Sequence, residues 1–298
     1  MNASALRLHA PAKVNLYLAV GDRRSDGYHD VTTVLAALDF ADELTLSPAR
    51  ELSVTTEPDL GIPAEDNLAY RAARDLGAAV GREPRAAIRV RKRIPHGAGL
   101  GGGSSDAAAV LAGLAAWWGL APADPRLLEV ARGIGADVAF FLRGGTALFS
   151  GRGDRLVREL PFVELPVVIV RPDQPVPTGA AYAAFDRHLR VSAPGPEGLT
   201  AALDAGDPRA VASELYNNMT DASCGLVAEV ADALAWLRAR RGVLGSAMAG
   251  SGSAVFGVCE SHDAAASAAR DVAPEGWWSV ATRTVAGGVR VTDEGSGA

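Results

Sequence analysis

Hydrophobic and polar residues alternate strictly along residues 13–20, KVNLYLAV. This period of two predicts a strand that buries one face and carries Lys13, Asn15 and Tyr17 on the other. The stretches that follow predict a mixed order of elements. They are strands over residues 31–48 and 86–95, the second ending at Pro95, and a helix over residues 66–81 with Asp66 as its cap and Gly81 as its stop.

Residues 94–111 read IPHGAGLGGGSSDAAAVL, with five glycines in the seven positions from Gly97 to Gly103. Glycine at this density costs conformational entropy when the chain folds. A helix with a hydrophobic stripe is predicted directly afterwards, from about residue 104 to residue 118. We therefore expect the backbone of this loop to close around a ligand at the start of the helix.

The pattern changes beyond about residue 160, and we place a soft boundary between residues 155 and 165. This boundary predicts two mixed lobes, residues 1–160 and residues 161–298, in an α+β protein. The other expected helices span residues 123–135 (Asp124 as cap, Pro125 in the first turn), 178–190, 198–206, 208–216, 227–242 and 263–273. Residues 135–154 are expected to pass through a short hydrophobic segment to a strand and a turn, and residues 247–260 are expected to form a glycine turn that runs into a strand. The other expected strands span residues 165–172 and 278–291.

Composition narrows the class of protein. Of the 298 residues, 48% are hydrophobic and 21% are charged, with a net charge of −6, which argues against a disordered or nucleic-acid-coating protein. Cys224 and Cys259 form no metal-binding or disulfide spacing, and no stretch predicts a signal peptide or a membrane span. We expect a cytoplasmic protein without a nucleic-acid or membrane partner, and the sequence leaves its oligomeric state open.

A glycine run before a helix suits an anion, because backbone N–H groups can close on the anion and the helix dipole adds positive potential. Ser104 and Ser105 either cap the helix or donate their hydroxyl groups to a phosphate. Three familiar phosphate loops do not fit this sequence. A dinucleotide fold needs a second strand ending in an acidic residue, a Walker loop needs lysine before the serine, and a protein-kinase loop runs into a strand. Phosphate binding of another kind is predicted, and a flexible connector is the alternative.

IPHGAGLGGGSSDAA resembles the second motif of the GHMP kinases. APAKVNLYL, with RSDGYHDVTTV behind it, resembles the first motif, and AMAGSGSAVFGV resembles the third. The resemblance implies the two-lobed GHMP kinase fold, with a ribosomal-protein-S5-domain-2-like N-terminal lobe and a ferredoxin-like C-terminal lobe. It implies that ATP is bound by Pro95, His96, Gly97, Ala98, Gly99, Leu100, Gly101, Gly102, Gly103, Ser104 and Ser105, and that motif three contributes Gly250, Ser251 and Gly252.

Phosphoryl transfer to a hydroxyl group needs charge neutralisation and usually a proton acceptor. Asp137, in GIGADVAFFL, is predicted to be either this acceptor or the cap of a short helix, and the resemblance favours the acceptor. Lys13 is one of only two lysines. It is predicted to activate the hydroxyl group electrostatically, with a solvent-facing lysine as the alternative. Lys92, the other lysine, is predicted to lie on a solvated strand face, and Asp106 is assigned no chemistry.

The DGYH stretch is the candidate acceptor site. The resemblance implies that Tyr28 stacks on a cytosine base and that His29 hydrogen-bonds the edge of the base, whereas a turn with Tyr28 in the core is the alternative. Asn15 and Thr178 are further predicted substrate contacts, and Thr178 fits a helix cap equally well. Magnesium is expected to be carried with ATP, because no cluster of metal-ligating side chains marks a dedicated metal site.

Within the family, DGYH and GLGGGSSDAA favour a kinase that phosphorylates a cytidine-linked alcohol of the non-mevalonate isoprenoid pathway. Three alternatives stay open. They are a kinase acting on mevalonate, homoserine or a sugar, a nucleotide-binding sensor without catalysis, and a decarboxylase acting on a diphosphate. The presence of both Lys13 and Asp137 argues against the sensor.

Overall fold

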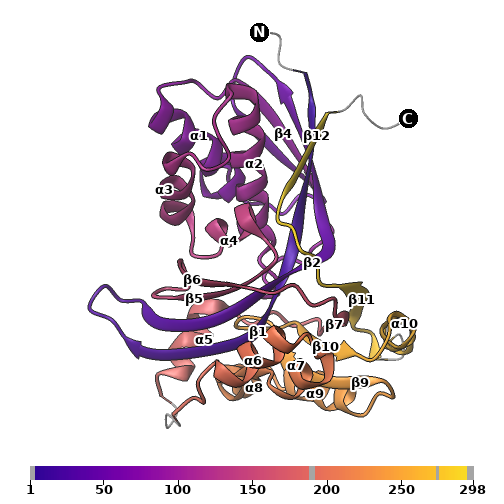
Figure 1. Cartoon of the computed structure of the whole chain (residues 1–298). Helices are drawn as coiled ribbons and strands as arrows, with labels where there is room; N and C mark the ends of the chain where they lie inside the picture. The colour runs from indigo at the N-terminus through magenta and orange to yellow at the C-terminus, as the bar shows by residue number, and fades with distance from the viewer. Residues whose placement is uncertain (1–3, 188–191, 273–274, 294–298) are drawn as a thin grey trace.

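The computed structural model of the chain describes residues 4–187, 192–272 and 275–293. Two lobes are joined by long strands that run from one lobe into the other (Figure 1). In the described residues, the larger sheet comprises β1 (Leu6–Arg23), β2 (His29–Pro48), β3 (Ser53–Glu57), β4 (Ala86–Arg91), β5 (Thr146–Ser150), β6 (Arg155–Leu160), β8 (Tyr216–Asn217) and β12 (Arg290–Asp293).

Helices cover one face of the upper part of this sheet (Figure 1). They are α1 (Leu68–Val80), α2 (Gly102–Trp118), α3 (Pro125–Ile134) and α4 (Val138–Arg143), preceded by the 3₁₀ turn η1 (Ala64–Asp66). Helix α2 lies flat on the sheet, since a methyl group at Gly113 would come within 3.0 Å of the Leu46 side chain. Alanine and leucine side chains of α1, α2 and the strands fill the space between them as a hydrophobic core.

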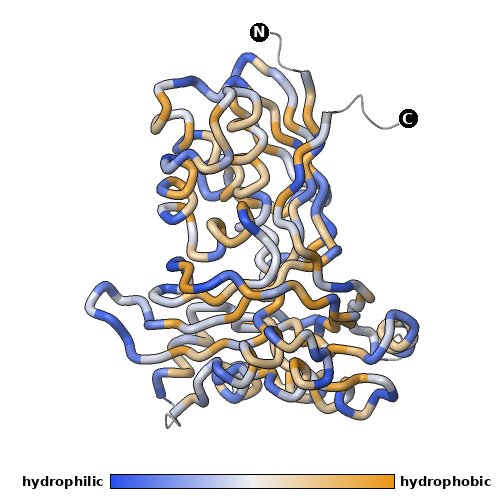
Figure 2. The backbone as a smooth tube through the Cα atoms, viewed as in Figure 1, coloured by the Kyte–Doolittle hydropathy of each residue, from blue (hydrophilic) through white to orange (hydrophobic). Residues whose placement is uncertain are grey.

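Strands β1 and β2 form a long antiparallel hairpin, paired from Leu6 opposite Leu46 to Arg23 opposite His29. The main path of the sheet runs β12-β1-β2-β4-β3, while β5 pairs with β2 and β6, and β8 pairs with β1. Hydrophobic residues follow the strands, and the tip of the hairpin is hydrophilic (Figure 2). This tip extends beyond the helices and, with α5, frames one side of the second lobe (Figure 1).

The prediction that β1 buries only one face is wrong. Lys13, Asn15 and Tyr17 are 4%, 4% and 3% exposed, although they occupy the polar positions of the alternating pattern. The reason is that this part of β1 lies between the lobes, where Tyr17 packs into the core of the second lobe. A buried polar face needs internal hydrogen-bond partners, so its residues become candidates for a site.

The second lobe is built on an antiparallel sheet in the order β11-β7-β10-β9. Its strands are β7 (Pro166–Arg171), β9 (Val243–Met248), β10 (Val255–Cys259) and β11 (Trp278–Arg283), and its helices are α5 (Thr178–Phe185), α6 (Glu197–Ala205), α7 (Pro208–Ser213), α8 (Thr220–Leu226), α9 (Glu229–Arg238) and α10 (His262–Asp271). The VVIV run of β7, residues 167–170, is wholly buried. Its continuous hydrophobicity is typical of a central strand covered on both faces.

Local signals placed several element ends correctly. Gly81 ends α1 in the left-handed conformation with φ 67°, and Asp124 caps α3 ahead of Pro125, as predicted. Asp66 is not the cap of α1, because the adjacent Asn67 accepts the capping hydrogen bond from the amide of Ala69. Helix α8 and strands β3, β6, β8 and β9 were not predicted, and residues 188–190 and 273 of two predicted helices lie outside the described residues.

The single strand predicted over residues 278–291 is wrong. Residues of β11 belong to the second lobe, whereas β12 pairs with β1 in the larger sheet. Gly287 and Gly288 lie in the crossing between them, and a methyl group at Gly288 would lie 2.2 Å from the carbonyl oxygen of Phe141. The amide of Val289 donates to that same carbonyl over 3.0 Å, so the crossing is attached to helix α4. The predicted division at residue 160 stays a prediction.

No helix in the described part of the chain combines the length and the hydrophobicity that a membrane span requires.

Candidate functional site

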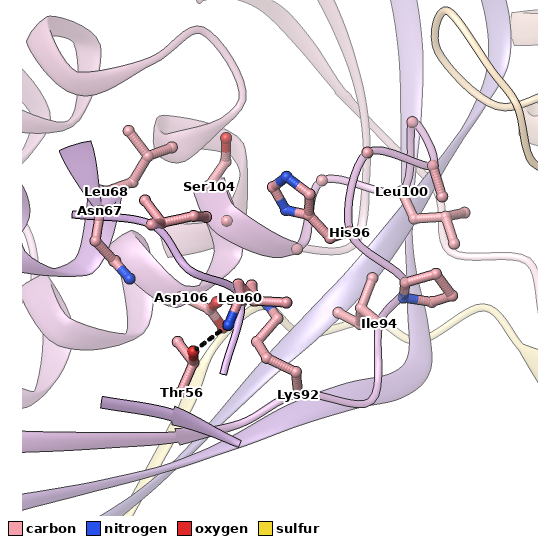
Figure 3. Close-up of a pocket in the computed structure, with 18 of the residues that line it drawn as sticks. Thr56, Leu60, Asn67, Leu68, Lys92, Ile94, His96, Leu100, Ser104 and Asp106 are labelled. Atoms are coloured by element: carbon pink, nitrogen blue, oxygen red, sulfur yellow. Dashed lines mark hydrogen bonds and ion pairs between the residues drawn. The ribbon is translucent and has the colours of Figure 1, made fainter. Parts of the chain in front are cut away.

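The glycine loop lines a cavity of about 270 Å³ at the N-terminus of α2 (Figure 3). The predicted loop residues from Pro95 through Ser104 all line this cavity. Hydrophobic side chains together with Thr56, Asp66 and Asn67 complete its wall. Lys92 and Asp106 lie beside Leu60 at its lower edge (Figure 3). A pocket with both hydrophobic and polar side chains that opens onto a loop of backbone amides suits a nucleotide, with the base in the pocket and the phosphates at the loop.

The loop is shaped by glycines in the left-handed conformation. Gly97, Gly99 and Gly101 have φ values of 67°, 79° and 76°, which other residues adopt only at a cost. Gly101 is the N-cap of α2 and offers no side-chain hydrogen bond, so the idea that Ser104 or Ser105 caps this helix is wrong. The first amides of α2 are therefore left for a bound anion.

The two serines have different surroundings. Ser104 lines the cavity and points upward beside His96 in Figure 3. Ser105 is wholly buried, and its hydroxyl oxygen has no hydrogen-bond partner among the described residues. The hydroxyl group that can meet a phosphate in this arrangement is that of Ser104.

The glycine loop packs directly against motif three, Gly250–Gly252, in the second lobe. A methyl group at Gly99 would lie 2.1 Å from the carbonyl oxygen of Ala249. The amide of Ala254 donates to the carbonyl of Ala98 over 3.2 Å. The motif is held in turn by Asn217, whose amide group donates to the carbonyls of Met248 and Gly250 at 2.8 Å each. Asn217 was missed by the sequence analysis, since a lone asparagine carries no local signal.

Lys13, Asn15 and Asp137 meet between the lobes. The Lys13 ammonium donates to the side-chain oxygen of Asn15 over 2.7 Å and lies 3.5 Å from a carboxylate oxygen of Asp137. The same Asn15 oxygen accepts the backbone amide of Gly250 over 2.9 Å, which links motif one to motif three. The alternative of a solvent-facing Lys13 is wrong, because its side chain is 4% exposed.

Asp137 occupies the N-cap position of α4, as the alternative predicted, but its side chain makes no capping hydrogen bond, so α4 does not use the carboxylate. Its side chain remains 30% exposed. A methyl group on the nearby Gly135 would lie 3.8 Å from the Ser104 hydroxyl oxygen. The segment that carries Asp137 therefore lies beside Ser104, in the first turn of helix α2.

A second cavity, of about 500 Å³, opens between the hairpin tip and α5. Tyr28, His29 and Thr178 line it, together with Ala136, which is next to Asp137. Tyr28 is 56% exposed, so the alternative of a core tyrosine is wrong. Its ring lies 5.0 Å from the guanidinium carbon of Arg152, a cation–π distance. An exposed aromatic ring in the wall of a cavity is suited to stack on a planar group.

The other residues of this cavity hold one another in place. Thr178 is the first residue of α5 and makes no cap, contrary to that alternative, and its hydroxyl lies 3.2 Å from the hydroxyl of Ser251. The ring of His29 lies 5.1 Å from the ring of Tyr182. Burial raises the pKa of Tyr182, and the charge of Asp137 raises it further, which places Tyr182 near the carboxylate. Tyr182 was also missed by the sequence analysis.

The prediction of a solvated Lys92 is wrong. Its side chain is 7% exposed, and its ammonium lies 2.5 Å from Asp42 and 2.6 Å from Asp106. Asp42 also accepts the backbone amides of Arg93 and Ile94, so its charge is well compensated. Asp106 accepts no backbone amide in the same way: its second carboxylate oxygen is buried and has no hydrogen-bond partner among the described residues. The one usable signal was the rarity of lysine in this chain.

The difference in hydrogen bonding between Asp42 and Asp106 predicts that the stability of the protein depends on pH. Burial raises the pKa of Asp106 to about 7, because Lys92 offsets only part of the desolvation and Asp42 is a like charge. Since this pKa is higher in the folded than in the unfolded chain, the stability linked to Asp106 is present at low pH and lost as the pH rises from about 4 to about 7.

Asp106→Asn keeps an oxygen for Lys92 and removes the titration. We expect the free energy of unfolding of the variant, relative to that of the wild type, to increase by about 1 kcal/mol for each pH unit between pH 5 and pH 7. Urea unfolding at several pH values measures the difference, with the exposed Asp173→Asn as control. A difference that does not change with pH would show that Asp106 stays ionised.

The chain matches two family models, "GHMP kinases N terminal domain" over residues 67–145 and "GHMP kinases C terminal" over residues 199–277. A 4-diphosphocytidyl-2-C-methyl-D-erythritol kinase of Nocardia farcinica is 39% identical, over 97% of this chain and 97% of that protein. The kinase of the same name from Pelotomaculum thermopropionicum is 40% identical over 84% of this chain and 87% of that protein.

Solved structures agree with the predicted two-lobed fold. The crystal structure of a 4-(cytidine 5'-diphospho)-2C-methyl-D-erythritol kinase superposes with a TM-score of 0.78 and 38% identity, covering 95% of this chain and 99% of that one. Homoserine kinase from Cytophaga hutchinsonii has a TM-score of 0.77 at 21% identity, covering 98% of both chains, and this likeness shows the fold alone. The chain thus belongs to the 4-diphosphocytidyl-2-C-methyl-D-erythritol kinase family, within the GHMP kinases.

Proposed function

We propose that this kinase transfers the γ-phosphoryl group of ATP to the 2-hydroxyl group of 4-diphosphocytidyl-2-C-methyl-D-erythritol, a step of the non-mevalonate route to isoprenoid precursors. The observation that carries the proposal is that the pair of Asp137 and Lys13 adjoins two different cavities. Ala136, the neighbour of Asp137, lines the second cavity, and a methyl group at Gly101 of the first cavity would lie 3.1 Å from the Lys13 side chain. One cavity has a glycine loop suited to a triphosphate, and the other has Tyr28 and His29, suited to a base. The names of the relatives support the choice of acceptor.

In the proposed mechanism, Asp137 accepts the proton of the attacking hydroxyl group. The carboxylate keeps 30% of its surface exposed, and the preceding residue, Ala136, lines the second cavity, so we place the reacting end of the acceptor beside Asp137. Lys13, 3.5 Å away, stabilises the ionised carboxylate and the developing negative charge on the hydroxyl oxygen. Asn15 orients the Lys13 ammonium through its 2.7 Å hydrogen bond.

The proposed ATP site combines the loop amides, the N-terminus of α2 and the Ser104 hydroxyl group. Magnesium carried with ATP would neutralise charge on the phosphates. It prefers oxygen ligands. The Ser104 hydroxyl in this cavity is such a ligand, and the phosphates supply others. In the described residues, no group of three or more histidine, cysteine, aspartate or glutamate side chains could hold a metal ion by itself.

The proposed acceptor site places the base between the hairpin tip and α5, with Tyr28 stacked on the base and His29 at its edge. Thr178 lines the same cavity and approaches Ser251 of motif three. Asn15 contacts the reacting end of the acceptor, since it touches Lys13. The free thiols of Cys224 and Cys259 support a cytoplasmic location, where thiols stay reduced.

The test is ATP consumption by the purified protein with magnesium, using 4-diphosphocytidyl-2-C-methyl-D-erythritol, mevalonate, homoserine and galactose as separate acceptors. We expect turnover with the cytidine-linked alcohol alone, at least ~100-fold above the others, because only that acceptor fills a base site. Preferred turnover of another acceptor would make the chain a different small-molecule kinase. ATP binding without turnover of any acceptor would favour the nucleotide sensor.

A further inference from the structure

His29 is held rigidly at the edge of the second cavity. Its Nε2 lies 2.8 Å from a carboxylate oxygen of Asp186, the residue that follows α5. The rings of Tyr182 and Phe185 lie 5.1 Å and 6.3 Å from the imidazole ring, the second in an edge-on contact. His29 is only 7% exposed. The imidazole therefore has one orientation, and both His29 and Asp186 line the cavity.

A carboxylate can only accept a hydrogen bond, so its 2.8 Å contact requires the proton of His29 to be on Nε2. In a neutral imidazole ring this leaves Nδ1 with a lone pair and no proton. Within the described residues, Nδ1 of His29 makes no hydrogen bond. The ring thus presents an unused acceptor to whatever binds beside it.

We propose that Asp186 is a specificity-determining positioning residue, which keeps His29 in the Nε2–H form so that Nδ1 accepts a hydrogen bond from the bound base. This inference rests on the function proposed above. A cytosine offers a donor at this edge, its exocyclic amino group. A uracil of the same shape offers a carbonyl oxygen there, which would face the lone pair of Nδ1. Asp186 therefore acts on the choice of base through His29.

Asp186→Asn tests the proposal because it barely changes the size of the side chain. The amide oxygen of asparagine still accepts from Nε2–H, but a rotated amide group donates to Nε2 and permits the Nδ1–H form. Both forms of His29 then become available, and the second can donate to a uracil carbonyl. We expect the cytidine-over-uridine preference in kcat/KM to fall at least ~10-fold, mainly through a gain with the uridine-linked acceptor.

The assay compares 4-diphosphocytidyl-2-C-methyl-D-erythritol with its uridine analogue, with KM for ATP as an internal reference. The control is Asp204→Asn, which removes a carboxylate paired with Arg158 outside the cavity. An equal loss with both acceptors would mean that Asp186 only supports the structure, and an unchanged preference would overturn the proposal directly.

Imidazole ¹⁵N signals give a readout that needs no turnover. With selectively labelled histidine, the wild type should show His29 protonated on Nε2 and unprotonated on Nδ1, and Asp186→Asn should show a mixture. A doubly protonated ring in the wild type would overturn the inference, since Nδ1 would then be a donor. If neither nucleotide-linked acceptor is turned over, the proposed function fails, and the ¹⁵N signals still decide the state of His29.

Discussion

Replacing Asp137 by asparagine is expected to lower kcat by about 10²- to 10⁴-fold, the range that a proton acceptor contributes in general base catalysis. The asparagine has nearly the same shape but neither accepts the proton nor holds a charge 3.5 Å from the Lys13 ammonium. Binding of ATP should stay within ~3-fold of the wild type, because the glycine loop and the start of α2 are untouched.

The measurement pairs single-turnover kinetics with calorimetric binding of ATP and magnesium. Asp124→Asn is the matched control, since asparagine also serves as a helix cap and α3 lies outside both cavities. Loss of ATP binding in step with turnover would mean that Asp137 has a structural role. A variant with normal turnover would remove it from the mechanism altogether.

Gly99→Ala is expected to lower kcat/KM for ATP by about 10²-fold, the effect of a displacement near 1 Å in an active site. The added methyl group would lie 2.1 Å from the carbonyl oxygen of Ala249, so the glycine loop and motif three must separate. Because Gly250 donates to Asn15, which orients Lys13, the displacement extends to the reacting groups. Stability should fall by about 1–3 kcal/mol as well, as in other overpacked cores.

Alanine at position 99 is strained both by the positive φ and by the clash with Ala249, and Gly119→Ala is a control that has the first kind of strain without the second. Gly119 has φ 66°, close to the φ of 79° at Gly99, but its added methyl group meets nothing within 4 Å. It should lose about 1 kcal/mol from the left-handed conformation and retain its kinetics. If Gly99→Ala resembles Gly119→Ala in thermal unfolding and in kcat/KM, the contact between the loop and motif three is not needed for activity.

Features that depend on neighbours in sequence were predictable. Gly81 and Asp124 act within one turn of their helices, and the glycine loop carries its own signature, so a single sequence is enough to place them. A two-lobed fold was expected from the change in the sequence pattern and is confirmed, whereas the division at residue 160 stays a prediction. Lys13 was identified as a candidate mainly through the family resemblance.

Features that depend on distant pairing were not predictable. The Lys92 ammonium forms an ion pair with Asp42, which is 50 residues away, and no local sequence pattern predicts that contact. An alternating strand also does not reveal that a second lobe covers its polar face, which is why Asn15 and Tyr17 looked half-exposed. The last strand was predicted wrongly for the same reason. The sequence around Gly288 does not show that β11 and β12 pair with different sheets, because the pairing partners lie far away along the chain.

The position of β12 has a consequence for synthesis on the ribosome. Residues 290–293 pair with residues 6–9, so the sheet that carries Lys13 gains its edge strand from residues that are translated long after the rest of that sheet. The link to α4, the helix that Asp137 precedes, also comes from this late segment. Until then, the nascent first lobe exposes the unpaired edge of β1, and an exposed strand edge is prone to pair wrongly with other chains. Chaperones that shield such edges would therefore matter most in the interval before residues 290–293 have left the ribosome.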